Sequence, residues 1–523
     1  MSLVAEYLDV IMFAVLCGAI LIGYPVIFTL AGVAVAFAVL GWSLGVFDFG
    51  LLGALSQRVF GLMVNDTLIA IPLFVFMGVV LERSRIAEDL LEEMGRQFGS
   101  LRGGLAVSVA LVGALLAAST GIVGATVVTM ALIALPSMLR NGYAPGFAAG
   151  TVCTAGTLGQ IIPPSTLLII LSDVMSSAFQ QAQFEQGLFT VETISVGQIF
   201  AAALVPGLVL VGLYIVYILA RAWLRPGDAP PIPRASAAGR ADGGVWRVLV
   251  PPILLIVAVL GSILGGIATP TEAASVGAVG ALLLAGLRLD VAGSKWPVYT
   301  AMLALLALVI LVNAVSIRVQ RSDAGVGDWL LAALAVTLIA LALYGVARAV
   351  LRAGHAGILA GTVTRTMTIT AMIFGTIIGA SIFSLVFRGL GGDEHIAIVI
   401  RQMPGGETGA MLFVMALVFV LGFVLDFVEI TVILLPIVAP VLMIMGYDPI
   451  WLSVLFAINL QTSFLTPPFG FSLFYLRGAA PKEISTGQIY AGVLPFIVLQ
   501  IVGVLVIWFL PAVATAIPRL LFG

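Results

Sequence analysis

The chain has 523 residues, of which 61% are hydrophobic and 9% are charged, and its formal net charge is −2. Soluble domains carry roughly 25% charged residues, so this composition excludes a soluble globular protein and predicts a protein embedded in a membrane. The charge balance argues against a nucleic-acid partner. Two cysteines and two histidines exclude a disulfide framework and argue against a Cys/His zinc site.

The N-terminal part of the chain, residues 1–66, is predicted to form scaffold helices. Its opening MSLVAEYLDV has no Lys or Arg before the first apolar run, so we expect no cleaved signal peptide. The stretch 82–96, ERSRIAEDLLEEMGR, has mixed charge at helical spacing. It predicts an amphipathic interfacial helix, which either links a hairpin to the scaffold or lies on the membrane.

Residues 103–139 are 37 residues without a charge. As one helix they would measure roughly 55 Å, whereas the hydrocarbon core is roughly 30 Å thick. Two full spans and a turn would need more residues than this segment has. A re-entrant hairpin fits better, and its tip is predicted within AASTGIVGAT, residues 117–126, where small and hydroxyl residues cluster.

The next segment, 144–172, is predicted to be a helix broken at GTLGQIIPPS, residues 156–165. Irregular backbone at membrane depth is tolerated only where it is buried in protein or lines a wet cavity. The free N–H ends at such a break attract anions, and its unwound carbonyl groups can bind a cation such as Na⁺. The alternative is a proline kink whose carbonyl groups are satisfied by neighbouring helices.

The pattern returns 304 residues later. Identities at this offset pair Pro163-Pro164 with Pro467-Pro468, and they also include Pro136 with Pro440 and the Gly-Tyr-x-Pro motifs at 142–145 and 446–449. This repeat indicates a duplication, which is usual in secondary transporters; the alternative is a chance match of two apolar segments. It predicts a second hairpin at 407–443 and a second broken helix at 450–476.

Orientation follows from the positive-inside rule. Placing the Arg-rich segment 221–247 in the cytoplasm leaves 17 basic residues inside and 5 outside. The two hairpins then enter from opposite sides, as inverted repeats. Spans are expected at 329–347 and 366–387, with a cytoplasmic loop between them holding Arg348, Arg352 and Arg365.

The predicted fold is therefore an all-α polytopic membrane protein with two inverted repeats, each with a re-entrant hairpin and a broken helix. Its predicted parts are N-terminal scaffold helices at 1–66, a first repeat at 67–220, a cytoplasmic linker at 221–247, scaffold helices at 248–295, an insertion with two extra spans at 296–355, and a second repeat with the C-terminal helix at 356–523.

Oxygen atoms at the hairpin tips and helix breaks are the candidate ligands. Asp426 is one of only two charged residues, with Glu429, between Thr408 and Pro440. An Asp at the bilayer centre costs roughly 2.5–3.5 kcal/mol, so we expect a partner or a water-filled site; the alternative is a solvated tip without a ligand role. The ion-binding candidates are Ser119, Thr120, Gly121, Gly156, Thr157, Asp426, Asn459, Thr462 and Thr466. The substrate-binding candidates are Pro163, Pro164, Ser165, Ser463, Pro467 and Pro468.

Three further polar residues are expected to be structural. Glu272, in ATPTEAAS, is expected to cap a helix together with Thr269 or Thr271. His355 and His395 are expected on the surface, in loops.

Five segments resemble the large membrane subunit of tripartite ATP-independent periplasmic (TRAP) transporters. They are LIGYPVIFTLAGVA (21–34), IPLFVFMG (71–78), AGTLGQIIPPS (155–165), GIATPTEAASVGA (266–278) and TPPFGFSLF (466–474). The resemblance covers nearly all of the chain except about 296–355. It implies a Na⁺-driven elevator transporter of the bacterial inner membrane that has no cofactor. Its implied partners are a small four-helix membrane subunit and a periplasmic binding protein that delivers an organic acid. The family usually has Ser-Gly-Ser at the first tip, where this chain has Ser119-Thr120-Gly121.

Other classes of function have less support. The chain has no H-E-x-x-H or G-x-S-x-G motif, which argues against an intramembrane enzyme. A Na⁺/carboxylate symporter that works without helper subunits is the main alternative, and a channel is a weaker one. The sequence does not identify the solute.

Overall fold

The computed structural model describes residues 5–232, 245–289, 294–315 and 325–523, and of Ser119, Thr120, Val245, Trp246, Arg247 and Asn313 it describes the backbone alone. The described residues form helices joined by turns, as the composition predicts. Part of the predicted linker, 233–244, lies outside the described residues. Of the loop predicted at 318–328, between the two spans of the insertion, residues 318–324 also lie outside the described residues.

The described residues of the first part of the chain form five helical segments, of which the last, α5, packs against α13 (Pro270–Leu289) and α16 (Ile358–Gly389). Asn65 caps α5 by accepting a hydrogen bond from the Thr67 backbone N–H at 3.0 Å, and α5 is bent by 52° from the helical segment before it. Because α5 ends at Arg83, Glu82 belongs to α5 and not to the amphipathic helix predicted at 82–96. The elements are α2 (Leu8–Leu21), α3 (Val26–Ser43), η1 (Phe49–Ala54), α4 (Leu55–Met63) and α5 (Asp66–Arg83).

The first half continues with an amphipathic helix, a hairpin and a broken helix. The hairpin turns at Gly121 and Ile122, between α7 and α8, and the broken helix loses its regular form between α9 and α10. The elements are α6 (Ile86–Phe98), α7 (Gly104–Thr120), α8 (Val123–Arg140), α9 (Pro145–Thr157), η2 (Leu158–Gln160), α10 (Thr166–Glu185) and α11 (Val196–Leu224).

The middle of the chain contains longer helices than expected. The predicted loop with Arg348, Arg352 and Arg365 is wrong, since α15 runs to His355 and α16 begins at Ile358, so all three arginines are helical. Apolar length marks where a helix crosses the membrane, but the helix itself continues past that boundary while its backbone bonds persist. The elements are α12 (Val245–Leu264), α13 (Pro270–Leu289), α14 (Trp296–Ala314), α15 (Val326–His355) and α16 (Ile358–Gly389).

The last part of the chain also contains an amphipathic helix, a hairpin and a broken helix in that order, but its hairpin returns through two short helices, α19 and α20, where the first hairpin has α8 alone. His395 lies in α17 rather than in a loop, and its Nδ1 is 3.0 Å from Oδ2 of the buried Asp9. The elements are α17 (Gly392–Arg401), α18 (Gly406–Leu421), α19 (Phe427–Ile433), α20 (Leu435–Ile444), α21 (Pro449–Leu465), α22 (Phe471–Ala479), α23 (Thr486–Phe509) and α24 (Ala512–Phe522).

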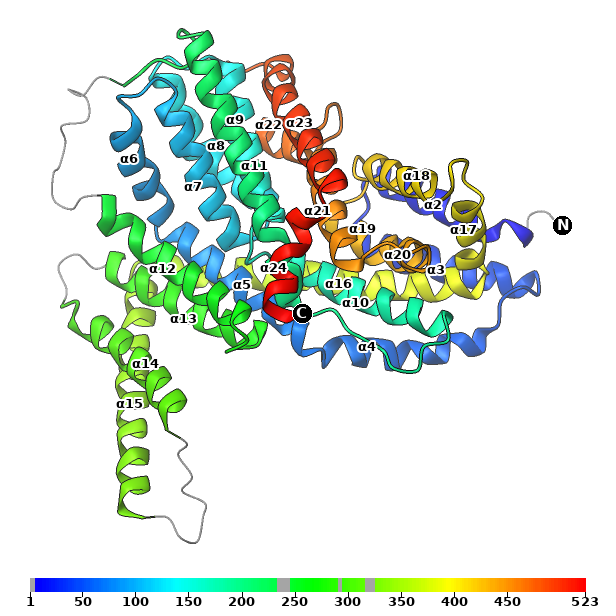
Figure 1. Cartoon of the computed structure of the whole chain (residues 1–523), viewed down its shortest axis with the longest axis horizontal. Coiled ribbons are helices and arrows are strands. Elements are labelled where there is room, and N and C mark those ends of the chain that lie inside the picture. Colours follow the sequence, from blue (N-terminus) through cyan, green and yellow to red (C-terminus); the bar gives the residue numbers. More distant parts are fainter. Residues whose placement is uncertain (1–4, 233–244, 290–293, 316–324) are drawn as a thin grey trace.

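The helices pack into two groups. In one group, α5 packs against both α13 and α16, α3 packs against α16, and α15 packs against α13. In the other, α7, α8 and α23 surround α9, while α11 and α18 contact α21. Helices α14 and α15 project from the rest of the molecule (Figure 1), and only 11% of the span in α15 is buried.

Seven of the described helices are long and apolar enough to cross a membrane, or up to nine if each of two bent helix pairs counts as one span. One of these pairs joins α19 to α20 with a bend of 55°, at the second hairpin.

Candidate functional site

A cavity of about 90 Å³ lies where both hairpin tips meet both helix breaks. The first tip contributes Gly121 to Gly124, and the second contributes Asp426 to Val428. Helix α16 closes the cavity with apolar side chains. The other lining residues are Gln160, Thr166, Leu167, Ile170, Ile369, Met372, Ile373, Phe464, Phe471 and Tyr475. The fold thus brings together segments some 300 residues apart in the chain.

The first tip is held against the start of α10. Gly121 ends α7 with φ +61°, a left-handed conformation that favours glycine. Its carbonyl oxygen accepts a hydrogen bond from Thr166 Oγ1 at 3.2 Å. A Cβ on Gly121 would lie 2.7 Å from both the backbone nitrogen and Oγ1 of Thr166. Only glycine allows this approach between the tip and the broken helix.

Two acidic residues of the second hairpin, Asp426 and Glu429, cap helix α19. Asp426 is the N-cap of α19: its Oδ1 accepts from the Phe427 N–H at 2.7 Å, and its own N–H donates to Glu429 Oε2 at 2.9 Å. Glu429 is buried. The two acids therefore bond to backbone N–H groups at a helix N-terminus, where negative charge is favoured. Asp426 also lines the cavity, which places a carboxyl group beside it.

The two broken helices meet behind the cavity. Gln461 Nε2 donates to Thr157 Oγ1 at 3.3 Å, and Thr157 Oγ1 donates to the carbonyl of Thr154 at 2.8 Å. Both side chains are buried. Among the described residues, Gln461 Oε1, Gln160 Oε1 and Thr154 Oγ1 are buried oxygens without a hydrogen-bond partner. The crossing is therefore rich in oxygen atoms that could accept further bonds.

Most of the predicted oxygen ligands bond within their own hairpin or helix. Thr462 Oγ1 donates to the Ile458 carbonyl at 2.8 Å, and Thr466 Oγ1 donates to the Thr462 carbonyl at 2.7 Å. Ser463 and Asn459 bind the second hairpin instead. Ser463 Oγ donates to the Phe419 carbonyl at 2.6 Å, and Asn459 Nδ2 to the Met415 carbonyl at 2.8 Å.

Gly156 lies at a close helix contact. A Cβ there would lie 2.5 Å from Cγ2 of Val127 in α8, so its small size lets α9 approach the hairpin. The side chains of Ser119 and Thr120 are outside the described residues. Of the nine predicted ion-binding residues, Gly121 and Asp426 line the cavity.

The two proline pairs differ in exposure. Pro163, Pro164 and Ser165 are buried, whereas Pro467 is half-buried and Pro468 is exposed. Both Pro–Pro peptide bonds are cis. Ser165 Oγ donates to the Gln160 carbonyl at 3.4 Å, and the Pro468 carbonyl accepts from the Tyr490 hydroxyl at 3.1 Å. None of the six predicted substrate-binding residues, all of them described, is among those that line the cavity.

Sequence reasoning missed Gln160, Thr166 and Tyr475. Gln160 lies within the predicted break at 156–165 and Thr166 directly follows it, so their polar side chains in this segment could have identified them. Tyr475 packs its ring on the first tip, since a Cβ on Gly124 would lie 2.7 Å from its Cζ. The cavity-lining residues of α16 are apolar, so no signal in the sequence distinguishes them from other membrane-helix residues.

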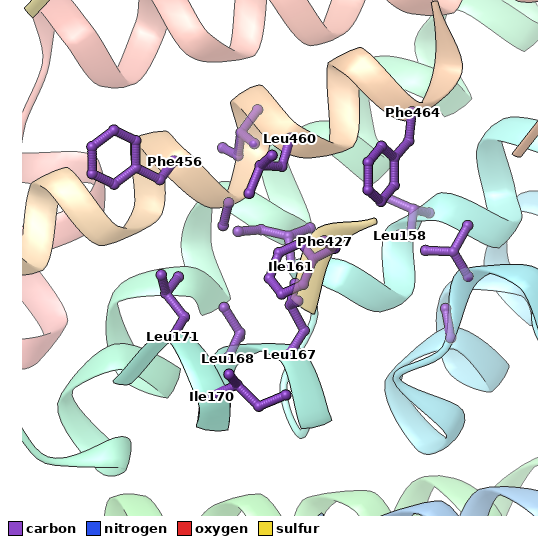
Figure 2. Packing of buried hydrophobic residues seen from close by; sticks show 14 of the residues in the cluster. Leu158, Ile161, Leu167, Leu168, Ile170, Leu171, Phe427, Phe456, Leu460 and Phe464 are labelled. Atoms are coloured by element: carbon purple, nitrogen blue, oxygen red, sulfur yellow. The ribbon is translucent and has the colours of Figure 1, made fainter. Parts of the chain in front are cut away.

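An apolar core connects the two halves near the cavity. Figure 2 shows Ile161 and Phe427 between side chains of α10 and side chains of α21. Phe427 belongs to the second tip and Ile161 to the first break. Close packing of this kind keeps the tips and breaks in one arrangement.

Glu272 is a helix cap, as expected from the sequence. The Thr269 N–H donates to Glu272 Oε2 at 2.8 Å, and the Glu272 N–H donates to Thr269 Oγ1 at 3.3 Å. This is a capping box at the start of α13, with Thr269 as the cap. Thr271 instead donates its hydroxyl to the Asp66 carbonyl, which ties α13 to α5.

Comparison with known proteins places the chain among transport proteins. The family model described as "Tripartite ATP-independent periplasmic transporter, DctM component" matches residues 10–350 and 291–513. The "C4-dicarboxylate TRAP transporter large permease protein DctM" of Pseudomonas aeruginosa is 27% identical over 471 residues, which are 89% of this chain and 89% of that protein.

A longer relative and a solved structure extend this finding. The "Isethionate TRAP transporter permease protein DctMQ" of Oleidesulfovibrio alaskensis is 26% identical over 521 residues, or 98% of this chain and 66% of that protein. The crystal structure of the Alcanivorax borkumensis YdaH transporter has a TM-score of 0.52 and 14% identity, over 90% of this chain and 87% of that chain. The latter likeness concerns the fold alone.

Proposed function

The chain belongs to the TRAP transporter family as its DctM component, the large permease subunit. On that premise we propose that it imports an anionic organic solute and that a Na⁺ gradient drives this import. It is a multi-pass membrane protein and, like its relatives, a transporter subunit and not an enzyme. The observation that carries the proposal is the cavity bounded by both hairpin tips and both helix breaks.

The proposed coupling ion is Na⁺, bound by oxygens near the tips and breaks. Na⁺ prefers oxygen ligands, and unwound backbone supplies them without further charged groups. Asp426 at the cavity and the unpartnered oxygens of Gln160, Gln461 and Thr154 support this location. The nine ion-binding candidates and the break residues named from the sequence remain our proposed set, to which these three oxygens are added.

The proposed inverted repeats are supported by one contact. Thr157 and Gln461 are separated by 304 residues, the same offset that relates the two proline pairs. Corresponding positions of two repeats meet where a two-fold axis passes between them, as in a symmetric dimer. The amphipathic helices α6 and α17 also correspond at about this offset and precede their hairpins. We retain the domain boundaries given above as part of this proposal.

Elevator-type movement is proposed because the hairpins and broken helices pack mainly with one another. Helix α16 touches the second hairpin through α19, and α5 touches α7 and α10. A body that carries the cavity past α5 and α16 would open it to each side in turn. Helix α15 contacts α16 and α13, but neither α14 nor α15 contributes a residue to the lining of the cavity.

The proposed partners are a small membrane subunit and a periplasmic binding protein. The name of the isethionate relative, DctMQ, joins two components in one longer chain, which supports a separate small subunit here. The proposed solute is an organic anion, since the relatives from Pseudomonas aeruginosa and Oleidesulfovibrio alaskensis are named for C4-dicarboxylates and for isethionate; other relatives are named for ectoine. The proposed location is the bacterial inner membrane. A symporter that works without helper subunits is the alternative, and uptake by the purified chain alone would establish it.

The test is Na⁺-dependent uptake of succinate or isethionate by proteoliposomes that contain the chain with its partner proteins. Asp426→Asn removes the charge but keeps a residue that caps helices equally well. We expect the Na⁺ concentration for half-maximal uptake to rise about tenfold or more, as for lost metal-site groups.

Asp448→Asn is the matched control. Asp448 also caps a helix, accepting from the N–H groups of Ile450 and Trp451 at 2.9 Å each, and it does not line the cavity. Its Na⁺ dependence should equal that of the wild type. If Asp426→Asn and Asp448→Asn both showed the Na⁺ dependence of the wild type, the ion would be bound elsewhere. If uptake by the wild type were independent of Na⁺, Na⁺ coupling would be refuted.

A further inference from the structure

A second hollow adjoins the cavity. It has a volume of about 400 Å³ and is lined by Ile122, Gly124, Ala125, Val128, Arg365, Thr368, Ile369 and Tyr475. Four of these residues, Ile122, Gly124, Ile369 and Tyr475, also line the cavity between the tips. The hollow is therefore continuous with the cavity along one face of α16, and we call it the α16 groove.

Arg365 is the cationic residue that lines the α16 groove. It lies one helical turn, about 6 Å, before Ile369. Residues four, seven and eight positions apart share a helix face, so Arg365 is on the same face as the cavity-lining Ile369, Met372 and Ile373. Its side chain is half-buried, and among the described residues it has no ion-pair or hydrogen-bond partner.

Three other arginines at the ends of long helices are engaged by protein groups. Arg221 pairs with Asp228 at 2.8 Å, Arg288 binds Asp89, and Arg388 donates to Gln181 Oε1 at 3.0 Å. A charged side chain within a membrane helix is costly, and it is usually paired or faces a wet cavity. Arg365 has the second kind of environment, which leaves its guanidinium group available to an anion from outside the chain.

A second cation lies on the same face. A Cβ on Gly361, one turn before Arg365, would lie 2.3 Å from Nη1 of Arg83. The Arg83 guanidinium group from α5 therefore covers the helix face next to the groove. Its neighbour Glu82 accepts a hydrogen bond from Thr129 at 2.7 Å. The two arginines make this end of the groove positive, whereas Asp426 places a carboxyl group at the cavity end.

We propose that Arg365 binds the carboxylate or sulfonate group of the transported solute in the α16 groove, with Arg83 adding to the local positive charge. This proposal rests on the proposed import of an organic anion. A guanidinium group forms two parallel hydrogen bonds to a carboxylate or sulfonate. The positive-inside assignment places Arg83 and Arg365 on the cytoplasmic side, so the contact belongs to the inward-open state, between the cavity and release. Tyr475 lines both hollows, so its side chain lies where they join.

The first experiment measures KM for succinate and for isethionate in proteoliposomes with the partner proteins. Arg365→Gln should raise KM about tenfold, as expected for a lost charge-assisted bidentate contact. Arg365→Lys should fall between Gln and the wild type, because it keeps the charge and loses the planar pair of bonds. Arg348→Gln, which removes an exposed arginine of α15, should leave KM unchanged.

The second experiment keeps one folded protein throughout. Arg365→Cys is made in a chain whose Cys17 and Cys153 are replaced by alanine. It is then modified with a cationic or an anionic methanethiosulfonate reagent. The cationic reagent should lower KM again and the anionic reagent should raise it further. Saturating succinate should slow the modification, whereas binding of a lipid phosphate at Arg365 would leave the modification rate independent of succinate.

The outcomes separate the two proposals. Wild-type protein that takes up neither anion would overturn the proposed function and this contact with it. Active wild-type protein whose KM is unaffected by Arg365→Gln, or by the charge placed at Arg365→Cys, would overturn the role of Arg365 alone. Modification that succinate does not slow would assign the guanidinium group to lipid and likewise defeat the proposal.

Discussion

Single residues decide how closely the tips approach the breaks. Gly121 and Gly422 are the clearest cases: a Cβ on Gly422 would lie 2.4 Å from Oγ of Ser463 in the second broken helix. In both halves a glycine of the hairpin faces a hydroxyl residue of the break. The side chain that is missing at each tip therefore determines the distance between the two elements.

Replacing Gly121 by alanine tests this approach. Gly121→Ala introduces a Cβ 2.7 Å from the Thr166 backbone and a left-handed residue, so we expect loss of most uptake and a lower melting temperature of the purified protein. Gly187→Ala is the matched control. Gly187 also has positive φ, at +77°, but no atom lies within 4 Å of its Cβ position. It should lose only about 1–2 kcal/mol and retain uptake. Equal effects of the two substitutions would contradict the proximity argument.

The candidate site was only partly predictable at this scale. Sequence identified the polar residue types at the tips and breaks, and Gly121 and Asp426 do line the cavity. It could not give the direction of each side chain. Thr462 and Thr466 bond to carbonyls of their own helix, because a threonine in a helix can always reach the residue four before it. Arg365 was expected in a loop, and only the helix around it shows that it faces a groove.

At the scale of elements, two amphipathic helices are tied to the scaffold by different pairs. Helix α6 is anchored by Asp89, which accepts from Arg288 Nη2 of α13 at 2.7 Å. Helix α17 is anchored by His395, whose ring is bonded to Asp9 of α2 and stacked on Tyr7. Each hairpin thus follows an amphipathic helix whose N-terminal part is bonded to a scaffold helix.

The tie at α17 predicts unequal effects of the two histidines. His395→Ala would leave the buried Asp9 carboxyl group without its partner, and we expect a loss of about 1–3 kcal/mol, seen as a lower melting temperature in detergent. His355 is exposed at the end of α15, so His355→Ala should melt like the wild type. If both variants melted alike, the hydrogen bond between His395 and Asp9 would be unimportant for stability.

Element boundaries show what sequence patterns could and could not supply. The predicted hairpin 103–139 corresponds to α7 and α8, which span 104–140 with one short tip, since a charge-free run too long for one span leaves few arrangements. The predicted loop between 347 and 366 was wrong because arginine is a good helix former. Its side chain can reach the interface while the helix continues.

At the scale of the molecule, the insertion is separate from the cavity. Helices α14 and α15 pack on each other and on α13, and they project from the remaining helices (Figure 1). Many of their large apolar side chains are exposed, including Val336 at 65%. The insertion therefore enlarges the surface offered to lipid or to a partner without reaching the tips.

Two tryptophan substitutions test this separation. Val336→Trp adds bulk to an exposed face of α15, so uptake, KM and Na⁺ dependence should equal those of the wild type. Ile369→Trp adds similar bulk to the cavity wall and should abolish most uptake by filling a space of about 90 Å³. Altered Na⁺ dependence in Val336→Trp would connect the insertion to the transport site. Wild-type uptake by Ile369→Trp would show that the cavity is not used.

The apolar side chains that α16 presents to the cavity bear on the rate of the transport cycle. Ile369, Met372 and Ile373 form no directional bonds with the tips, so a tip that travels along them exchanges one set of dispersion contacts for another. A polar wall would require hydrogen bonds to be broken during the crossing, at about 1–3 kcal/mol for each group left unpaired. Every 1.4 kcal/mol added to an activation barrier slows a step about tenfold. Under the proposed elevator movement, the apolar face of α16 would therefore keep the barrier of each crossing low, and it would act on turnover number rather than on affinity.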